Sequence, residues 1–146
     1  MILVENLGDK YHRWEETIGQ TAGAELSQMD ETWRAAIRHR VGVSGVVSSS
    51  YIQRIGEKFY QDLETSLQHA SVADRILPDK LIEAQETVAG TDPLLGQAVL
   101  STGNLLLRIQ DEPRLSDMPQ EFKRVFITGR AKQVTKEFMP PLRPRQ

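Results

Sequence analysis

The chain has 146 residues, with 18 Lys and Arg against 20 Asp and Glu, so its formal net charge is −2. Apolar residues make up 39% and charged residues 26%, which is typical of a globular protein and excludes collagen-like and wholly disordered chains. Because cysteine is absent, disulfides, thiol catalysis, cysteine-ligated zinc sites and iron–sulfur clusters are excluded too.

Helical periodicity dominates the sequence and predicts an all-α fold. We expect a single-domain bundle of five to six helices over residues 1–139, in which residues 1–45 form a candidate semi-independent arm, and an extended proline-rich tail over 140–146. No run approaches the ~18 apolar residues of a membrane span, and no secretory signal is visible. We therefore expect a cytoplasmic protein, while export by a signal-independent route stays open.

The first predicted helix covers residues 9–19. There Tyr11, Trp14 and Ile18 recur three and four positions apart, which is the spacing of one helical face. Gly19 then loosens the chain, because glycine weakens a helix.

A second helix is predicted after Gly23, with Ser27 or Asp30 as its N-cap. The basic residues at 38–40 suit a helix C-terminus, and Gly42 is the expected stop signal. The apolar face of this helix carries Met29, Trp33, Ala36 and Ile37.

Residues 41–50 (VGVSGVVSSS) are the least helical part and favour a short strand or an ordered loop. The serine run at their end offers an N-cap for a strong amphipathic helix over 50–73. Its apolar stripe consists of Ile52, Ile55, Phe59, Leu63, Leu67 and Ala70.

Two further helices are predicted after the break at Pro78. The first covers 79–89 and ends with Gly90 as a C′ residue. The second covers 93–110, is capped by Asp92, and is apolar around most of its circumference. Such a helix is buried inside a fold or an assembly, and we expect a small bundle to have difficulty enclosing it alone.

Asp117 is the predicted cap of a last helix over 118–139, whose register breaks at Gly129. One face of this helix carries Phe122, Val125 and Phe126.

Charge is distributed unevenly along the C-terminal half. Residues 81–112 hold five acids and one base, whereas residues 113–146 hold eight bases and three acids. The basic segment is compatible with a solvated surface, with contact to an acidic protein surface, or with contact to nucleic-acid phosphates. Against nucleic acid stands the overall pI of about 5.9.

No catalytic constellation is visible. His12, His39 and His69 are far apart and have no ligand companion at helical spacing, so no metal site is expected. The motif around Ser44 is not a nucleophile elbow, and no glycine-rich phosphate loop occurs. We expect no enzyme activity and no cofactor, and we assign no catalytic residues.

The sequence predicts a non-catalytic helical subunit for protein–protein interaction: an adaptor, a structural component or a chaperone-like component of a larger assembly, with other subunits or its own copies as partners. Small size, many helices and a tail also suit bacterial or phage assembly components. The alternative is a small nucleic-acid-associated regulator that uses the basic segment 123–145. The candidate partner-binding residues are Trp14, Trp33, Leu95, Leu106, Lys123, Arg124, Arg130, Lys132, Arg143 and Arg145.

Two of these expectations have alternatives that the sequence leaves open. Trp14 and Trp33 are partner anchors if the N-terminal segment is a separate arm, and core residues if it packs on the long helix. The tail motif PPLRPR resembles ligands of aromatic grooves that bind polyproline II segments.

Overall fold

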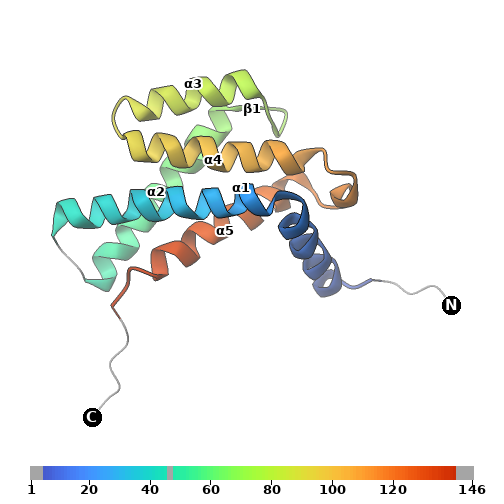
Figure 1. The fold of residues 1–146 in the computed structure, drawn as a ribbon, viewed down its shortest axis with the longest axis horizontal. Coiled ribbons are helices and arrows are strands. Elements are labelled where there is room, and N and C mark those ends of the chain that lie inside the picture. Colours follow the sequence, from blue (N-terminus) through green and yellow to red (C-terminus); the bar gives the residue numbers. More distant parts are fainter. Residues whose placement is uncertain (1–4, 46–47, 141–146) are drawn as a thin grey trace, which may run out of the picture.

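A computed structural model describes residues 5–45 and 48–140 of the chain. In this part the fold is all-α, as the periodicity predicts, with five α-helices, one 3₁₀ turn and one two-stranded hairpin (Figure 1). The elements are α1 (Leu7–Ser44), α2 (Ser49–His69), β1 (Ser71–Val72), β2 (Arg75–Ile76), α3 (Pro78–Ala89), α4 (Pro93–Gln110), η1 (Pro113–Leu115) and α5 (Gln120–Lys136).

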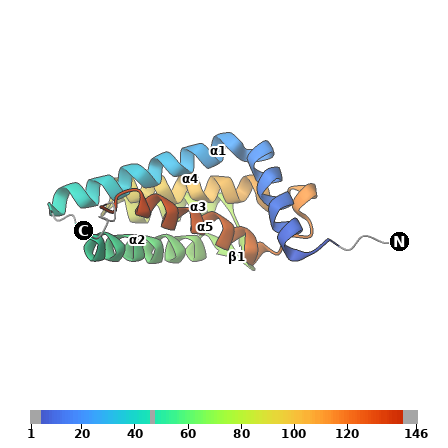
Figure 2. The same ribbon diagram turned by 90° about the horizontal axis from the view of Figure 1, so that it is seen from below.

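The helices form two layers around one core. Figure 1 shows α3, α4 and the longer part of α1 stacked side by side, with α2 and α5 passing behind them. Figure 2 shows the same layers from below, with α1 and α2 on opposite sides of the molecule. Apolar side chains of all five helices meet in a single buried cluster.

One kinked helix, α1, replaces the two helices expected before residue 41. The backbone leaves helical geometry only at Ala22, where φ is −133° and ψ is 30°. The Thr21 hydroxyl donates to the Thr17 carbonyl at 2.6 Å, and a hydroxyl that competes in this way bends helices. The segment before the kink, residues 7–21, is called the arm below, and it leaves the bundle at a steep angle (Figures 1 and 2).

The expected caps and stop signal of the second helix are therefore wrong. Ser27 and Asp30 lie inside α1, and Gly42 does not end it. The helix continues to Ser44 and ends at Gly45, whose φ of 68° is left-handed and whose N–H bonds to the Val41 carbonyl at 3.2 Å.

The segment 41–50 is mostly helical, which corrects the prediction of a strand or loop; residues 46 and 47 lie outside the described part. Ser48 supplies the N-cap of α2, as the serine run predicts, because its Oγ accepts from the Tyr51 N–H at 3.3 Å.

A tight hairpin ends α2 four residues before the predicted end. Ala73 and Asp74 both have positive φ, as a two-residue hairpin turn requires. The Gln110 side chain fixes this hairpin by pairing with the N–H and the carbonyl of Ile76, both at 3.0 Å. A long-range contact thus holds the hairpin that follows α2.

Helix α4 lies at the centre, and the other helices of the chain cover it. Glycines let α3 approach closely: a Cβ on Gly96 would lie 2.7 Å from Ala89 Cβ, and one on Gly103 would overlap the Leu81 side chain. Residues on most sides of α4 are buried within this one chain. The bundle thus encloses most of this helix, contrary to the expected difficulty, and leaves Leu94, Leu100 and Leu107 half-buried.

The caps around α4 are partly as predicted. Asp92 accepts from the Leu95 N–H at 3.0 Å, which confirms the N-cap. Gly90, however, ends α3 with a helical φ of −62°, so it is not a left-handed C′ residue.

Helix α5 begins later than predicted and is continuous. Its N-cap is Pro119, without a side-chain cap, and Gly129 does not interrupt it. The Asp117 carboxylate is not a cap, because it instead bonds Arg13 and Trp14 of the arm. Most of the tail, residues 141–146, lies outside the described part.

Candidate interaction surface

The four apolar residues expected to anchor a partner lie in the core. Trp14, Trp33, Leu95 and Leu106 are each at most 3% exposed. The Trp33 indole donates to Thr102 Oγ1 at 2.8 Å and packs edge-on against Phe59, with ring centroids 4.6 Å apart. Both tryptophans follow the core alternative, so the structure does not support these residues as surface anchors.

Four of the five basic residues of α5 contact other groups of the chain, whereas Lys136 is exposed and forms no ion pair with a described residue. Lys123 is buried, and its Nζ donates to the Gln110 carbonyl at 3.2 Å; burial lowers the pKa of this amine. Arg124 bonds Ser71, Arg130 pairs with Asp30 at 2.5 Å, and Lys132 lies 5.1 Å from the Tyr60 ring centroid.

These contacts weaken the case for phosphate binding by α5. A phosphate-binding helix needs cations free to reach the backbone of a nucleic acid, and four of those expected here are committed to other groups. Arg143 and Arg145 lie outside the described residues. The nucleic-acid alternative therefore has no supporting observation on this helix.

Four exposed apolar side chains lie on the arm and on the first turns of α5; Tyr11 and Phe122 belong to the junction of the two helices, and Val125 also borders Glu64 and Gln68 of α2. Leu7 is 65% exposed, Tyr11 49%, Phe122 45% and Val125 60%. We call these four residues the arm–α5 face. Leu7 and Tyr11 lie one turn apart on the arm, and Phe122 and Val125 lie on one side of α5, so each helix contributes a short apolar stripe.

Ring contacts and ion pairs hold the two stripes together. Tyr11 lies 5.8 Å from Phe126, and Trp14 lies 6.4 Å edge-on from Phe122, measured between ring centroids. Arg13 links the arm to the segment before α5, because it pairs with Asp117 at 2.5 Å as well as with Glu5 at 2.8 Å.

The carboxylate at this junction is strongly stabilised in its charged form. Asp117 accepts from the Arg13 guanidinium and, at 3.0 Å, from the Trp14 indole, and these two bonds lower its pKa to about 2. The Arg13 hydrogen bond likewise lowers the pKa of Glu5. The arm is thus fixed to α5 by charged groups around an apolar centre.

Charged residues within and beside the two segments are mostly acidic. Residues 5–21 and 117–126 together hold six acids and four bases: Glu5, Asp9, Glu15, Glu16, Asp117 and Glu121 against Lys10, Arg13, Lys123 and Arg124. Arg13 is already paired, whereas no described cation pairs with Glu15 or Glu121. The surroundings of the arm–α5 face therefore have a surplus of negative charge.

The sequence contained part of the signal for this face. The helical spacing of Phe122 and Val125 indicates a shared side of one helix, and Tyr11 belongs to a periodic stripe. The spacing does not tell which stripe is turned to the solvent. That depends on the kink at Ala22, because the kink sets the direction of the arm.

The remaining candidate chemistries do not converge. Within residues 5–45 and 48–140, no three His, Asp or Glu side chains are grouped so that they could hold a metal ion. His12, His39 and His69 are exposed on separate segments. No helix in the same ranges is both long and apolar enough to cross a membrane. No family model, curated protein or solved structure matches the chain.

Proposed function

We propose that the protein is a non-catalytic helical interaction subunit of a larger assembly and that it binds its partner through the arm–α5 face. The observation that carries this proposal is the joint exposure of Leu7, Tyr11, Phe122 and Val125, which come from opposite ends of the chain. Scattered single exposed apolar residues need no explanation, but a cluster with aromatic members is typical of an interaction site.

The chemistry around the face indicates an amphipathic helix as the partner. Apolar anchors of such a helix, spaced three and four residues apart, would cover the two stripes. Lysines or arginines beside those anchors would then face Glu15 and Glu121, which have no cation partner among the described residues. Complementary charge of this kind favours basic over acidic partner helices.

A pair of designed peptides tests this assignment. Both are helices of about 18 residues, or five turns, with the same leucine stripe, and they differ only in having lysine or glutamate on the polar face. Fluorescence anisotropy of the labelled peptides measures binding to the full chain. We expect the lysine peptide to bind and the glutamate peptide not to bind; failure of both, or equal binding, overturns the proposal.

Substitutions then locate the binding surface. Phe122→Ser and Val125→Ser are each expected to weaken the binding of the lysine peptide at least about tenfold. Ile82→Ser is the matched control, because Ile82 is 49% exposed but lies on α3, which does not contribute to the face. Equal weakening by Ile82→Ser contradicts the assignment.

Light scattering on the free protein tests whether a second copy of the chain occupies the arm–α5 face. A monomer supports a separate partner. A dimer that Phe122→Ser dissociates would place a second copy on the face and overturn the assignment to a partner helix.

A further inference from the structure

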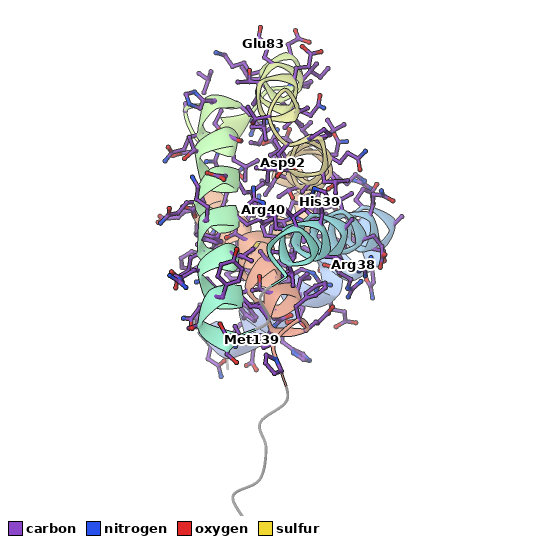
Figure 3. All side chains as sticks on the ribbon, turned by 90° about the vertical axis from the view of Figure 1, so that its left-hand side faces the viewer. Arg38, His39, Arg40, Glu83, Asp92 and Met139 are labelled. Atoms are coloured by element: carbon purple, nitrogen blue, oxygen red, sulfur yellow. The ribbon has the colours of Figure 1, made fainter. Side chains whose placement is uncertain are left out.

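A cationic cavity lies at the other end of the molecule from the arm. It has a volume of about 600 Å³ and lies between the last turns of α1, the first turns of α2 and the start of α4. Figure 3 shows this end, with His39 and Arg40 of α1 near Asp92 of α4. The cavity is largely open to solvent, so a ligand there would be covered on one side only.

The charged groups of the cavity leave a positive surplus. His39, Arg40, Arg54 and Lys58 line it, against Asp92 as an acid. Arg40 is held by Asp92 at 3.1 Å and approaches Asp62 at 3.7 Å, and Asp62 also pairs with Lys58 at 2.9 Å. Two carboxylates thus offset two of the three permanent cations.

Arg54 supplies the unbalanced charge. It forms no ion pair with a described residue, and its guanidinium lies 5.7 Å from the centroid of the Tyr51 ring. Asp92 is occupied as well, because it caps α4 through the Leu95 N–H and also bonds Arg40. A ligand anion beside Arg54 therefore meets a cation without a competing carboxylate of its own.

The rest of the cavity is suited to the organic part of a ligand. Val43, Ile55 and Pro93 give it an apolar side, and the Tyr51 ring adds an aromatic one. Arginine binds phosphate oxygens through two parallel N–H donors.

We propose that this cavity binds a small organic phosphate, with Arg54 contacting the phosphate and the apolar side contacting the organic group. The inference is independent of the arm–α5 face, which lies at the opposite end of the molecule (Figures 1 and 3).

Calorimetric titration of the full chain with three probes tests the ligand class. Phenyl phosphate carries both parts, inorganic phosphate carries the anion alone, and phenol carries the ring alone. We expect phenyl phosphate to bind at least about tenfold more tightly than phosphate, phenol not to bind, and the affinity to fall with added salt. No binding of phenyl phosphate at millimolar concentration, or equal binding of phenol, overturns the proposal.

Two arginine variants locate the site. Arg54→Gln is expected to weaken the binding of phenyl phosphate at least about tenfold, and Arg54→Lys should restore only part of the affinity, because it keeps the charge but not the two parallel N–H donors. Arg38→Gln is the control: Arg38 is exposed on the same end of α1 but does not line the cavity, and it points away from Arg40 in Figure 3. If Arg38→Gln weakens binding as much as Arg54→Gln, only general surface charge attracts the ligand and the site is rejected.

Discussion

The contact between α3 and α4 and the contact between the arm and α5 are built in opposite ways. Between α3 and α4, Gly96 and Gly103 bring the backbones together over Ala89 and Leu81, and all four residues are largely covered. Between the arm and α5, large aromatic rings touch through their edges while much of their surface remains exposed. The first contact is closed, and the second is open on one side.

This difference shows that the apolar content of a helix does not locate an interaction surface. Helix α4 is the most hydrophobic helix of the described chain, and its own neighbours cover it. Helix α5 has a weak apolar stripe, yet Phe122 and Val125 on it are among the most exposed apolar residues. An apolar stripe on a helix stays exposed only where the remaining elements of the chain are not placed to cover it.

The free energy of unfolding should be more sensitive to an added methyl group at the closed contact than at the open one. Gly103→Ala places a Cβ inside the space of the buried Leu81 side chain, which cannot swing into solvent. We expect the free energy of unfolding to fall by about 1–3 kcal/mol, as for other overpacked cores. Urea unfolding followed by circular dichroism measures the change.

The same substitution on the arm is the control. Gly19 lies in α1 with open space where its Cβ would be, so Gly19→Ala should raise the free energy of unfolding by about 0.5–1 kcal/mol through the helix preference of alanine. If both variants shift stability in the same direction, the tight approach of α3 to α4 is not the cause.

The sequence predicts local structure well where the signal lies within one segment. The cap and proline at the start of α4, the serine cap of α2 and the all-α fold all follow from residue type and spacing. Predictions were wrong where a residue distant in sequence forms a hydrogen bond that the local pattern does not reveal. Asp117 suits a cap, but Arg13 and Trp14 bind it, and α2 is followed by a hairpin that Gln110 holds through Ile76.

The candidate site was predicted less well for the same reason. Trp14 and Trp33 have the residue type of partner anchors, but tertiary packing buries them. The basic residues of α5 suit a charged surface until Asp30 and Ser71, far away in sequence, bind two of them. Which residues remain free is a property of the whole fold and not of any one segment.

The open contact should tolerate loss of its apolar groups. Val125 is 60% exposed and Phe122 45%, so much of each side chain gains nothing from burial. We expect Phe122→Ser and Val125→Ser each to lower the free energy of unfolding by at most about 1 kcal/mol, within the range of surface substitutions and small core losses. Urea unfolding measures both variants, and a larger loss would mean that the face serves the fold and not a partner.

The smallest expected effect is the pH response of the arm, because solvent screens the exposed pair of Arg13 and Asp117. The pKa of Asp117 is lowered from 3.8 to about 2 by Arg13 first and Trp14 second. A carboxyl group with a lowered pKa in the folded state contributes stability that is complete above its ordinary pKa. That contribution decreases as the pH falls from about 4 and is lost as the pH passes through about 2.

The two tryptophans make this response measurable within one molecule. The Trp14 indole N–H donates to Asp117, whereas that of Trp33 donates to Thr102 in the core. In a proton–nitrogen NMR titration, the Trp14 indole signal should therefore shift with a midpoint near pH 2 while the Trp33 signal stays constant. Asp117→Asn, whose amide oxygen still accepts from Trp14, should abolish that shift. A Trp14 midpoint near 3.8 would show that Arg13 does not hold the carboxylate, and joint movement of both signals would show that the arm and the core lose their structure together.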